Sequence, residues 1–187
     1  MNRTTTDRLR RGFTLIELLL VMAIIVILMG LLMSGIAKAR QQGELQRGRA
    51  QMAILVAAFQ AYYADYATWP WAETGEDSYP VDARVVRLLQ GVDERGGTPN
   101  LQGNDRLRTY LETKSIQTNS AGAFADPWGN AYQAVFDADR GEVIPNPFGP
   151  AGSSNRVPFL VWSKGPNGTS DSNGEMSDAN KDNLRSN

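Results

Sequence analysis

The hydrophobic pattern sets one long apolar run apart from the rest of the chain. Residues 18–37 carry no charged side chain, and they lie between Glu17 and Lys38. At about 1.5 Å of rise per residue, this run makes a helix of roughly 30 Å, the thickness of a bilayer's hydrocarbon core. The run therefore predicts a membrane-spanning helix, which we place at residues 13–37.

Apolar residues continue at helical spacing beyond this run. They recur three and four positions apart, on one face of a helix: Met52, Leu55, Val56, Phe59, Tyr62, Tyr63 and Tyr66. We therefore expect one helix from about Phe13 to Tyr66. It must end before Trp69 and Pro70, because proline disfavours the helical conformation in the residue that precedes it.

Two features of this helix predict local weakness. Small residues within the span are expected bend points: Gly30, Ser34 and Gly35. Residues 38–51 are mostly polar and contain Gly43 and Gly48. We expect this polar stretch to be loosely held until neighbouring chains pack against it.

Residues 71–120 are rich in turn-forming residues. A short amphipathic helix is expected at residues 82–90, ended by Gly91. Its inward-facing side chains would be Val85, Val86 and Leu89. Residues 105–113 fit a short helix and a strand equally well, and both alternatives stay open.

Two later segments have the pattern of strands. Residues 132–136 follow a turn and alternate their side chains, so that one face can pack on the long helix. Residues 157–163 predict a second strand, with Phe159 and Val161 on one face and Leu160 and Trp162 on the other. The expected fold class is α+β: a long N-terminal hydrophobic helix packed on a small C-terminal antiparallel sheet with long loops.

Composition and charge narrow the class of protein. Apart from the N-terminal residues and the span, about 150 of the 187 residues remain, enough for one ordinary domain. The chain has no His and no Cys, so it lacks the usual catalytic pairs, the commonest zinc ligands and any disulfide. We do not expect an enzyme. A net charge of −1, without a basic cluster after the span, argues against nucleic acid as a partner.

The start of the apolar run carries the most specific motif. Gly12 follows Arg10 and Arg11, and residues 12–17 read Gly-Phe-Thr-Leu-Ile-Glu. A carboxylate in lipid costs about 2.5–3.5 kcal/mol, so Glu17 is expected to have a partner or a function. The motif resembles the prepilin cleavage and methylation site of type IV pilins and type II secretion pseudopilins.

This resemblance implies a processing pathway and an assembly role. A prepilin peptidase would remove residues 1–12 by cutting between Gly12 and Phe13, and the new Phe13 amine would be methylated. Glu17 would then neutralise the Phe13 amine of a neighbouring subunit in a helical homopolymer. A simple signal anchor, in which Glu17 only complements the helix dipole, is the alternative.

Basic residues before the span place the leader in the cytoplasm by the positive-inside rule. With the resemblance, we expect a single-pass inner-membrane protein whose residues 38–187 form a pilin-like domain in the periplasm, or outside the cell if there is no outer membrane. In the assembled state it would lie in a periplasmic or surface filament.

Two further segments resemble the major type II secretion pseudopilin. Tyr62, Asp65, Trp69 and Pro70 match its helix exit, and residues 126–132 read Asp-Pro-Trp-Gly-Asn-Ala-Tyr, with Ala131 in place of proline. In this second segment we expect Trp128 to fill the core rather than to bind a ligand.

The tail, at about residues 163–187, resembles the calcium loop of the same family. Calcium prefers six to eight oxygen ligands on a flexible loop. The candidate ligands are Asn167, Asp171, Asp178 and Asp182. Asn167 stands where the family usually has Asp, and Asn183 replaces another acid. Without metal, the acids are expected to repel one another and the loop to loosen.

Two alternatives to this calcium site stay open. The tail could be a solvated segment without metal, because its composition buries no core. A second oxygen cluster, at residues 137–142, has the opening spacing of a calcium loop, although a hairpin turn is favoured there.

The resemblance implies a structural subunit of a type II secretion pseudopilus, a fibre that drives protein export. Its partners would be prepilin peptidase, minor pseudopilins and an inner-membrane assembly platform. A type IV pilin for adhesion, motility or DNA uptake is the alternative within the family. A membrane-anchored binding module, with a ligand loop at residues 71–103 carrying Trp69, Trp71 and Tyr79, is the alternative from another class.

Overall fold

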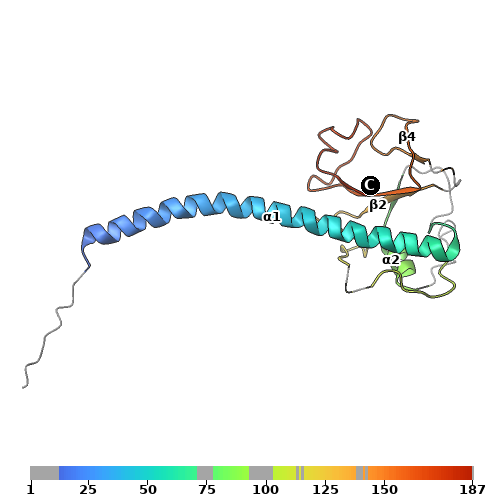
Figure 1. The fold of residues 1–187 in the computed structure, drawn as a ribbon, viewed down its shortest axis with the longest axis horizontal. Helices are drawn as coiled ribbons and strands as arrows, with labels where there is room; N and C mark the ends of the chain where they lie inside the picture. Colours follow the sequence, from blue (N-terminus) through green and yellow to red (C-terminus); the bar gives the residue numbers. More distant parts are fainter. Residues whose placement is uncertain are drawn as a thin grey trace, which may run out of the picture. The chain divides into compact units, whose positions relative to one another are not determined.

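The computed structural model describes residues 13–70, 78–92, 103–112, 114, 116–137, 141 and 143–186. Two compact units make up the chain, Met1–Gly43 and Glu44–Asn187. Helix α1, Leu15–Tyr66, is continuous across the boundary between them (Figure 1). The predicted long helix is confirmed, and its expected bend points do not interrupt it.

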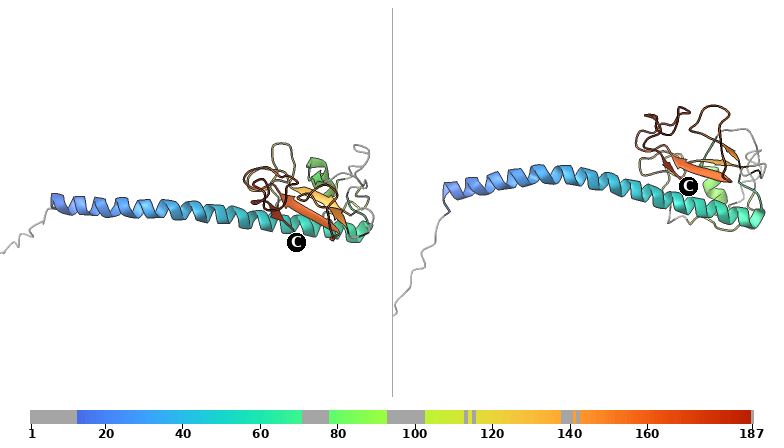
Figure 2. Two further views of the ribbon diagram at one scale, coloured as in Figure 1. Left: turned by 90° about the horizontal axis from the view of Figure 1, so that it is seen from above. Right: turned by 45° about the horizontal axis from the view of Figure 1, so that its top comes forward.

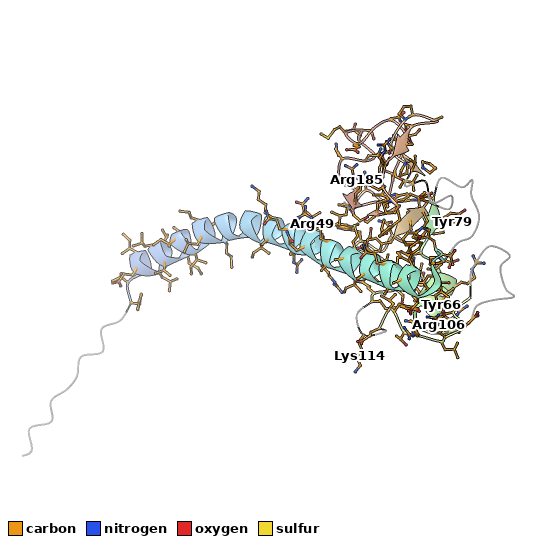
Figure 3. The ribbon with its side chains drawn as sticks, turned by 45° about the vertical axis from the view of Figure 1, so that its right-hand side comes forward. Arg49, Tyr66, Tyr79, Arg106, Lys114 and Arg185 are labelled. Carbon is orange, nitrogen blue, oxygen red and sulfur yellow. The ribbon has the colours of Figure 1, made fainter. Side chains whose placement is uncertain are left out.

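In the first unit, α1 is a bare apolar helix. Every described residue from 13 to 30 is exposed, and the large apolar side chains there range from 43% exposed at Ile25 to 89% at Leu15. Figure 3 shows these side chains projecting from all sides of the helix. A soluble monomer rarely exposes so large an apolar surface, so this segment requires lipid or other chains around it.

The second unit combines the C-terminal part of α1 with a small sheet. The four-stranded sheet has the order β1-β2-β5-β6, and all its pairs are antiparallel. Its strands are β1 (Tyr79–Pro80), β2 (Gln133–Phe136), β5 (Phe159–Ser163) and β6 (Leu184–Arg185). A separate antiparallel pair consists of β3 (Ile144–Pro145) and β4 (Ser154–Asn155). The two predicted strands, now β2 and β5, are confirmed as the centre of the sheet.

Side-chain alternation along β2 and β5 divides the core in two. Ala134, Phe136 and Val161 join a cluster with the α1 residues Leu55 and Phe59. The opposite face contributes to a second cluster of Val135, Ile144, Phe148, Leu160 and Trp162. The predicted division of β5 into two faces is therefore confirmed. Figure 2 shows the sheet alongside the C-terminal part of α1.

Helix α2, Ala83–Leu89, forms where the amphipathic pattern predicted it. The Asp82 carboxylate caps it by accepting hydrogen bonds from the backbone N–H groups of Arg84 and Val85. Gly91, with a φ of 92°, ends it in the left-handed conformation that glycine adopts at no steric cost. By contrast, the described part of residues 105–113 forms neither helix nor strand, so both alternatives for that segment were wrong.

The exit of α1 is fixed by aromatic stacking as well as by proline. Ala67 has a φ of 52°, and its N–H donates to the carbonyl of Tyr63 at 2.7 Å. Trp69 is buried and stacks on Tyr63, with ring centroids 4.3 Å apart. The turn therefore folds Trp69 back onto the helix that it ends.

Gly48 corrects the expectation of a loosely held polar stretch. A Cβ at this position would lie 2.5 Å from Leu184 Cδ1 and 3.4 Å from Pro127 Cδ. The Tyr132 hydroxyl donates to the Gly48 carbonyl at 2.9 Å. The glycine is thus a point of close approach, where strand β6 and the turn after Asp126 pack on α1 within the same chain.

Candidate functional site

The N-terminal end of α1 is closed by a reciprocal cap between Thr14 and Glu17. The Glu17 carboxylate accepts hydrogen bonds from the Thr14 N–H at 3.0 Å and the Thr14 hydroxyl at 2.8 Å. The Glu17 N–H donates back to the Thr14 hydroxyl oxygen at 3.4 Å. This capping box satisfies backbone donors that have no partner within the helix.

Of the predicted processing residues, the structure places Phe13, while Gly12 lies outside the described residues; it also places the predicted assembly residue, Glu17. Phe13 is 78% exposed, directly before the cap. Thr14 is a residue that the sequence reasoning missed. The Thr-x-x-Glu spacing of residues 14–17, a known capping signature, would have found it.

The surface that follows Glu17 is apolar over about the thickness of a bilayer's hydrocarbon core, as far as Lys38. Helix α1 is long and apolar enough to cross a membrane, by length and composition. The chain thus presents an apolar helix whose only acid in the first turn is held by the helix's own cap.

The turn at residues 126–132 and the start of the tail meet around Asp126, which is fully buried. Its carboxylate accepts hydrogen bonds from the N–H groups of Trp128 and Asn130 at 3.0 and 2.8 Å, and from the Ser163 hydroxyl at 2.5 Å. The Asn130 side chain donates to the carbonyl of Gly165 at 2.9 Å. The turn at residues 126–132 therefore anchors the start of the tail, a link that spacing along the sequence did not reveal.

Trp128 lies at the edge of the core rather than in it. Its ring is partly buried against the main cluster, and its Nε1 donates to the Glu44 carboxylate at 3.1 Å. The expected packing role is confirmed in part, because the indole N–H needs a polar partner and so stays near the surface.

Asp65, from the helix-exit motif, holds the loop at residues 103–112. It accepts a hydrogen bond from the Tyr110 hydroxyl at 2.7 Å and pairs with the Arg108 guanidinium at 2.9 Å. These donors, the Tyr110 hydroxyl foremost, lower the pKa of the Asp65 carboxyl. Arg106 adds a weaker ion pair at 3.5 Å and lies over the ring of Tyr66, 5.5 Å from its centroid (Figure 3).

The four candidate calcium ligands do not converge on one point. Asn167 and Asp182 are adjacent, with the Asn167 amide donating to the Asp182 carboxylate at 2.7 Å. The Asp178 carboxylate turns outward to Lys181, at 2.8 Å, and is 99% exposed. Asp171 instead accepts hydrogen bonds from Asn173, Ser177 and Asn180.

The four candidate side chains are not gathered into one cluster of carboxylates. Within the described ranges, no group of three or more His, Cys, Asp or Glu side chains is arranged to hold a metal ion. The alternative cluster starts at Asp137, which is buried, but residues 138–140 and 142 lie outside the description. Calcium binding therefore stays a prediction of the sequence.

The alternative of a binding module expected Trp69 to contact a ligand, but Trp69 is buried in the core. Trp69 packs against Phe136 and Phe159, with ring centroids 5.0 Å from each. Tyr79 lies in β1, and Trp71 is outside the described residues. A depression of about 390 Å³ beside Trp69 is lined by Tyr63, Asp137, Phe159 and neighbouring residues.

Comparison with known proteins shows what the sequence is similar to. The profile of the prokaryotic N-terminal methylation motif matches residues 7–33, which include Gly12, Phe13 and Glu17. The chain is 26% identical over 136 residues to the type II secretion system core protein G of Escherichia coli (strain K12), covering 73% of this chain and 78% of the relative. The chain therefore carries the prepilin-type methylation motif and is similar to a type II secretion core protein over most of its length.

Two other relatives extend the likeness over most of the chain. The type II secretion system core protein G of Dickeya chrysanthemi is 24% identical over 78% of this chain and 81% of its own. That of Klebsiella pneumoniae is 23% identical over 89% of this chain and 92% of its own. No solved structure matches this chain at the same level of significance.

Proposed function

We propose that this chain is a structural subunit of a type II secretion pseudopilus, a fibre whose growth drives protein export. The observation that carries the proposal is the bare apolar helix of the first unit, with a capped acid at its start and a methylation motif around it. Such a surface is stable in lipid and in a bundle of identical helices, and it can pass from one to the other.

Maturation would expose the amine that assembly requires. Prepilin peptidase would cut between Gly12 and Phe13, and Phe13 would be methylated. The new amine lies one helical turn from Glu17. Because a carboxylate has acceptor sites for several donors, Glu17 can keep its cap to Thr14 and also accept the Phe13 amine of a neighbour.

The pairing of Glu17 with Phe13 would set the register of the fibre. Opposite charges attract strongly in an apolar bundle, where few water molecules screen them. Removing one partner leaves the other charge buried and unpaired, which is strongly destabilising. Buried apolar surface would supply most of the free energy of assembly, and the ion pair would select the arrangement.

The remaining assignments concern location, partners and chemistry. Basic residues of the leader favour a cytoplasmic N-terminus, so the second unit would lie in the periplasm. Minor pseudopilins and an inner-membrane assembly platform would be the other partners, with a cytoplasmic ATPase supplying the energy. The role is mechanical, and no reaction is assigned to the chain.

A complementation experiment tests this function. The full chain is expressed in a bacterium whose type II system lacks its own major pseudopilin, and the secreted substrate is measured by activity in the medium. We expect restored secretion and, by mass spectrometry, a mature N-terminus at methylated Phe13. Normal processing without secretion, accompanied by surface fibres, would instead favour a type IV pilin.

A further inference from the structure

We propose that asparagine amides take the place of a divalent cation in residues 163–186, so that this loop closes without calcium. The inference concerns the folding of the second unit and does not depend on the proposed export function. It rests on where the side-chain nitrogen atoms of Asn167, Asn180 and Asn183 lie.

The Asn167 amide lies among three oxygen atoms. Its Nδ2 lies 2.7 Å from Asp182 Oδ1, 3.0 Å from the Ala179 carbonyl and 3.2 Å from the Asp178 carbonyl, so its two hydrogens are shared among three acceptors. Its Oδ1 accepts from the Thr169 N–H at 2.8 Å, which fixes the orientation of the amide. A carboxylate and two carbonyls that converge in this way need a positive centre, which an N–H group or a cation can supply.

Asn180 makes the same kind of contact deeper in the loop, where it is 3% exposed. Its Nδ2 donates to the carbonyl and the carboxylate of Asp171 at 2.8 and 2.9 Å, and to the Gly174 carbonyl at 2.8 Å. Its Oδ1 accepts from the Asp171 N–H at 2.9 Å. The Asp171 carboxylate is thereby committed to donors within the protein.

Asn183 lies among oxygen atoms as well. With its Nδ2 turned toward the backbone, it donates to the carbonyls of Lys164 and Thr169 at 3.0 and 3.2 Å. In the opposite orientation it donates only to Asn180 Oδ1, at 3.1 Å. The first orientation satisfies two backbone carbonyls but places Asn183 Oδ1 3.1 Å from Asn180 Oδ1, so the Asn183 amide meets oxygen atoms in either orientation.

The acids of the loop also have separate partners. Asp178 pairs with Lys181, and Glu175 pairs with Arg185. Residues 163–186 hold four acidic and three basic side chains, so little net charge needs neutralising. This corrects the expectation that the acids cluster and repel one another in the absence of metal.

An aspartate at position 167 would replace the amide donor with a further negatively charged acceptor. It would bring a second carboxylate to hydrogen-bonding distance of Asp182, beside two carbonyl oxygens. Two carboxylates that close do not both stay ionised without a cation or a shared proton. Asn167→Asp should therefore create a dependence on calcium that the natural chain does not have.

The first test uses the natural chain, purified in detergent. Thermal unfolding is followed by tryptophan fluorescence in EDTA and in about 5 mM CaCl₂, well above the roughly 0.1–1 mM at which extracellular calcium modules bind. We expect the same Tm in both media and no saturable heat on calorimetric titration with calcium. A Tm that rises by several degrees in calcium, with saturable binding, would overturn the proposal.

The second test compares variants at Asn167 with a matched control. Asn167→Asp should lower the Tm in EDTA by several degrees, and calcium should restore it. Asn167→Ala removes the amide without adding charge, so its Tm should fall equally in both media. Ser172→Asp adds the same charge at an exposed position of the same loop, and its Tm should be the same in EDTA and in calcium.

Each variant outcome decides the proposal. If Asn167→Asp unfolds in EDTA, recovery of its fluorescence transition on refolding in calcium supports the inference. An Asn167→Asp chain that matches the natural one in both media would contradict it, as would an Asn167→Ala chain of unchanged Tm.

Discussion

At the scale of single residues, the carboxylates of Glu17 and Asp126 hold the start of α1 and the start of the tail through hydrogen bonds. Glu17 stood out because a carboxylate at the edge of an apolar run is costly. Its hydrogen bonds to Thr14 depend on the local conformation at the helix start, where Thr14 acts as the cap. The hydrogen bond from Ser163 to Asp126 was not predictable from the sequence either, because the two residues lie 37 positions apart.

The cap and the assembly role of Glu17 can be separated by changing Thr14. Thr14→Val keeps the shape but removes the hydroxyl, which should weaken the helix end by about 1 kcal/mol. We expect fewer fibres but not their loss, because Glu17 keeps its charge. Thr14→Ser should assemble normally. A loss of fibres in Thr14→Val as complete as in Glu17→Ala would assign the whole role of Glu17 to capping.

Asp126 is expected to be the most sensitive polar residue of the second unit. Asp126→Ala leaves the N–H groups of Trp128 and Asn130 without their acceptor in a buried site. It should lower the free energy of unfolding by roughly 2–4 kcal/mol in urea titrations. Ser163→Ala removes the hydroxyl that donates to Asp126 and accepts from the Gly165 N–H, but leaves those two N–H groups with their acceptor, so it should cost less, about 1–2 kcal/mol. Equal effects of the two variants would contradict the central position of Asp126.

At the scale of elements, hydrophobic periodicity predicted the longer helices and strands and missed the strands of two residues. Helices α1 and α2 and strands β2 and β5 each contain enough residues to show a period. Strands β1, β3, β4 and β6 have two residues each, so they exist only through pairing with distant segments. The role of Gly48 was misjudged for the same reason, because its neighbours Leu184 and Pro127 lie far along the sequence.

Two glycines of α1 give a matched pair for this packing. A side chain at Gly43 meets nothing within 4 Å, whereas one at Gly48 runs into Leu184 and Pro127. Gly48→Val should therefore destabilise the second unit by about 1–3 kcal/mol through overpacking. Gly43→Val should be neutral or slightly stabilising, because valine favours a helix more than glycine. Equal midpoints of the two variants in urea would refute the close approach at Gly48.

At the scale of the whole molecule, the sequence predicted the α+β fold class with its long apolar N-terminal helix. It did so because membrane length and helical period are properties of the chain itself. The state of the tail was not predictable in the same way. Counting oxygen-bearing residues indicated a metal site, whereas the partner of each carboxylate is decided by the folded loop.

Stability should depend on pH through the acids of the second unit. Hydrogen bonds from Asn173 and Ser177 lower the pKa of the Asp171 carboxyl, and Arg185 lowers the pKa of that of Glu175. A lowered folded pKa gives stability that is present above the unfolded value of about 4 and is lost as the pH falls below it. We expect the Tm to be constant from about pH 6 to 8 and to fall below about pH 4. A Tm that rises on acidification would contradict these pairings.

Alkaline pH should act through a buried tyrosine. Burial raises the pKa of the Tyr132 hydroxyl, which donates to the Gly48 carbonyl. A raised folded pKa means that this stability is present below the unfolded value of about 10 and is lost as the pH rises above it. In Tyr132→Phe the Tm should therefore fall less steeply above pH 10 than in the natural chain. The same alkaline fall in Tm for both chains would argue against a role of the Tyr132 hydroxyl.

The most direct test of the central claim is the amount of fibre formed by charge variants of Glu17. The natural chain, Glu17→Ala and the exposed-acid control Glu112→Ala are each expressed with the type II assembly machinery, and sheared surface material is imaged and quantified by immunoblot. The account predicts fibres from the natural chain and from Glu112→Ala, and a cleaved, membrane-inserted but unassembled Glu17→Ala. Fibres of normal abundance from Glu17→Ala would contradict it.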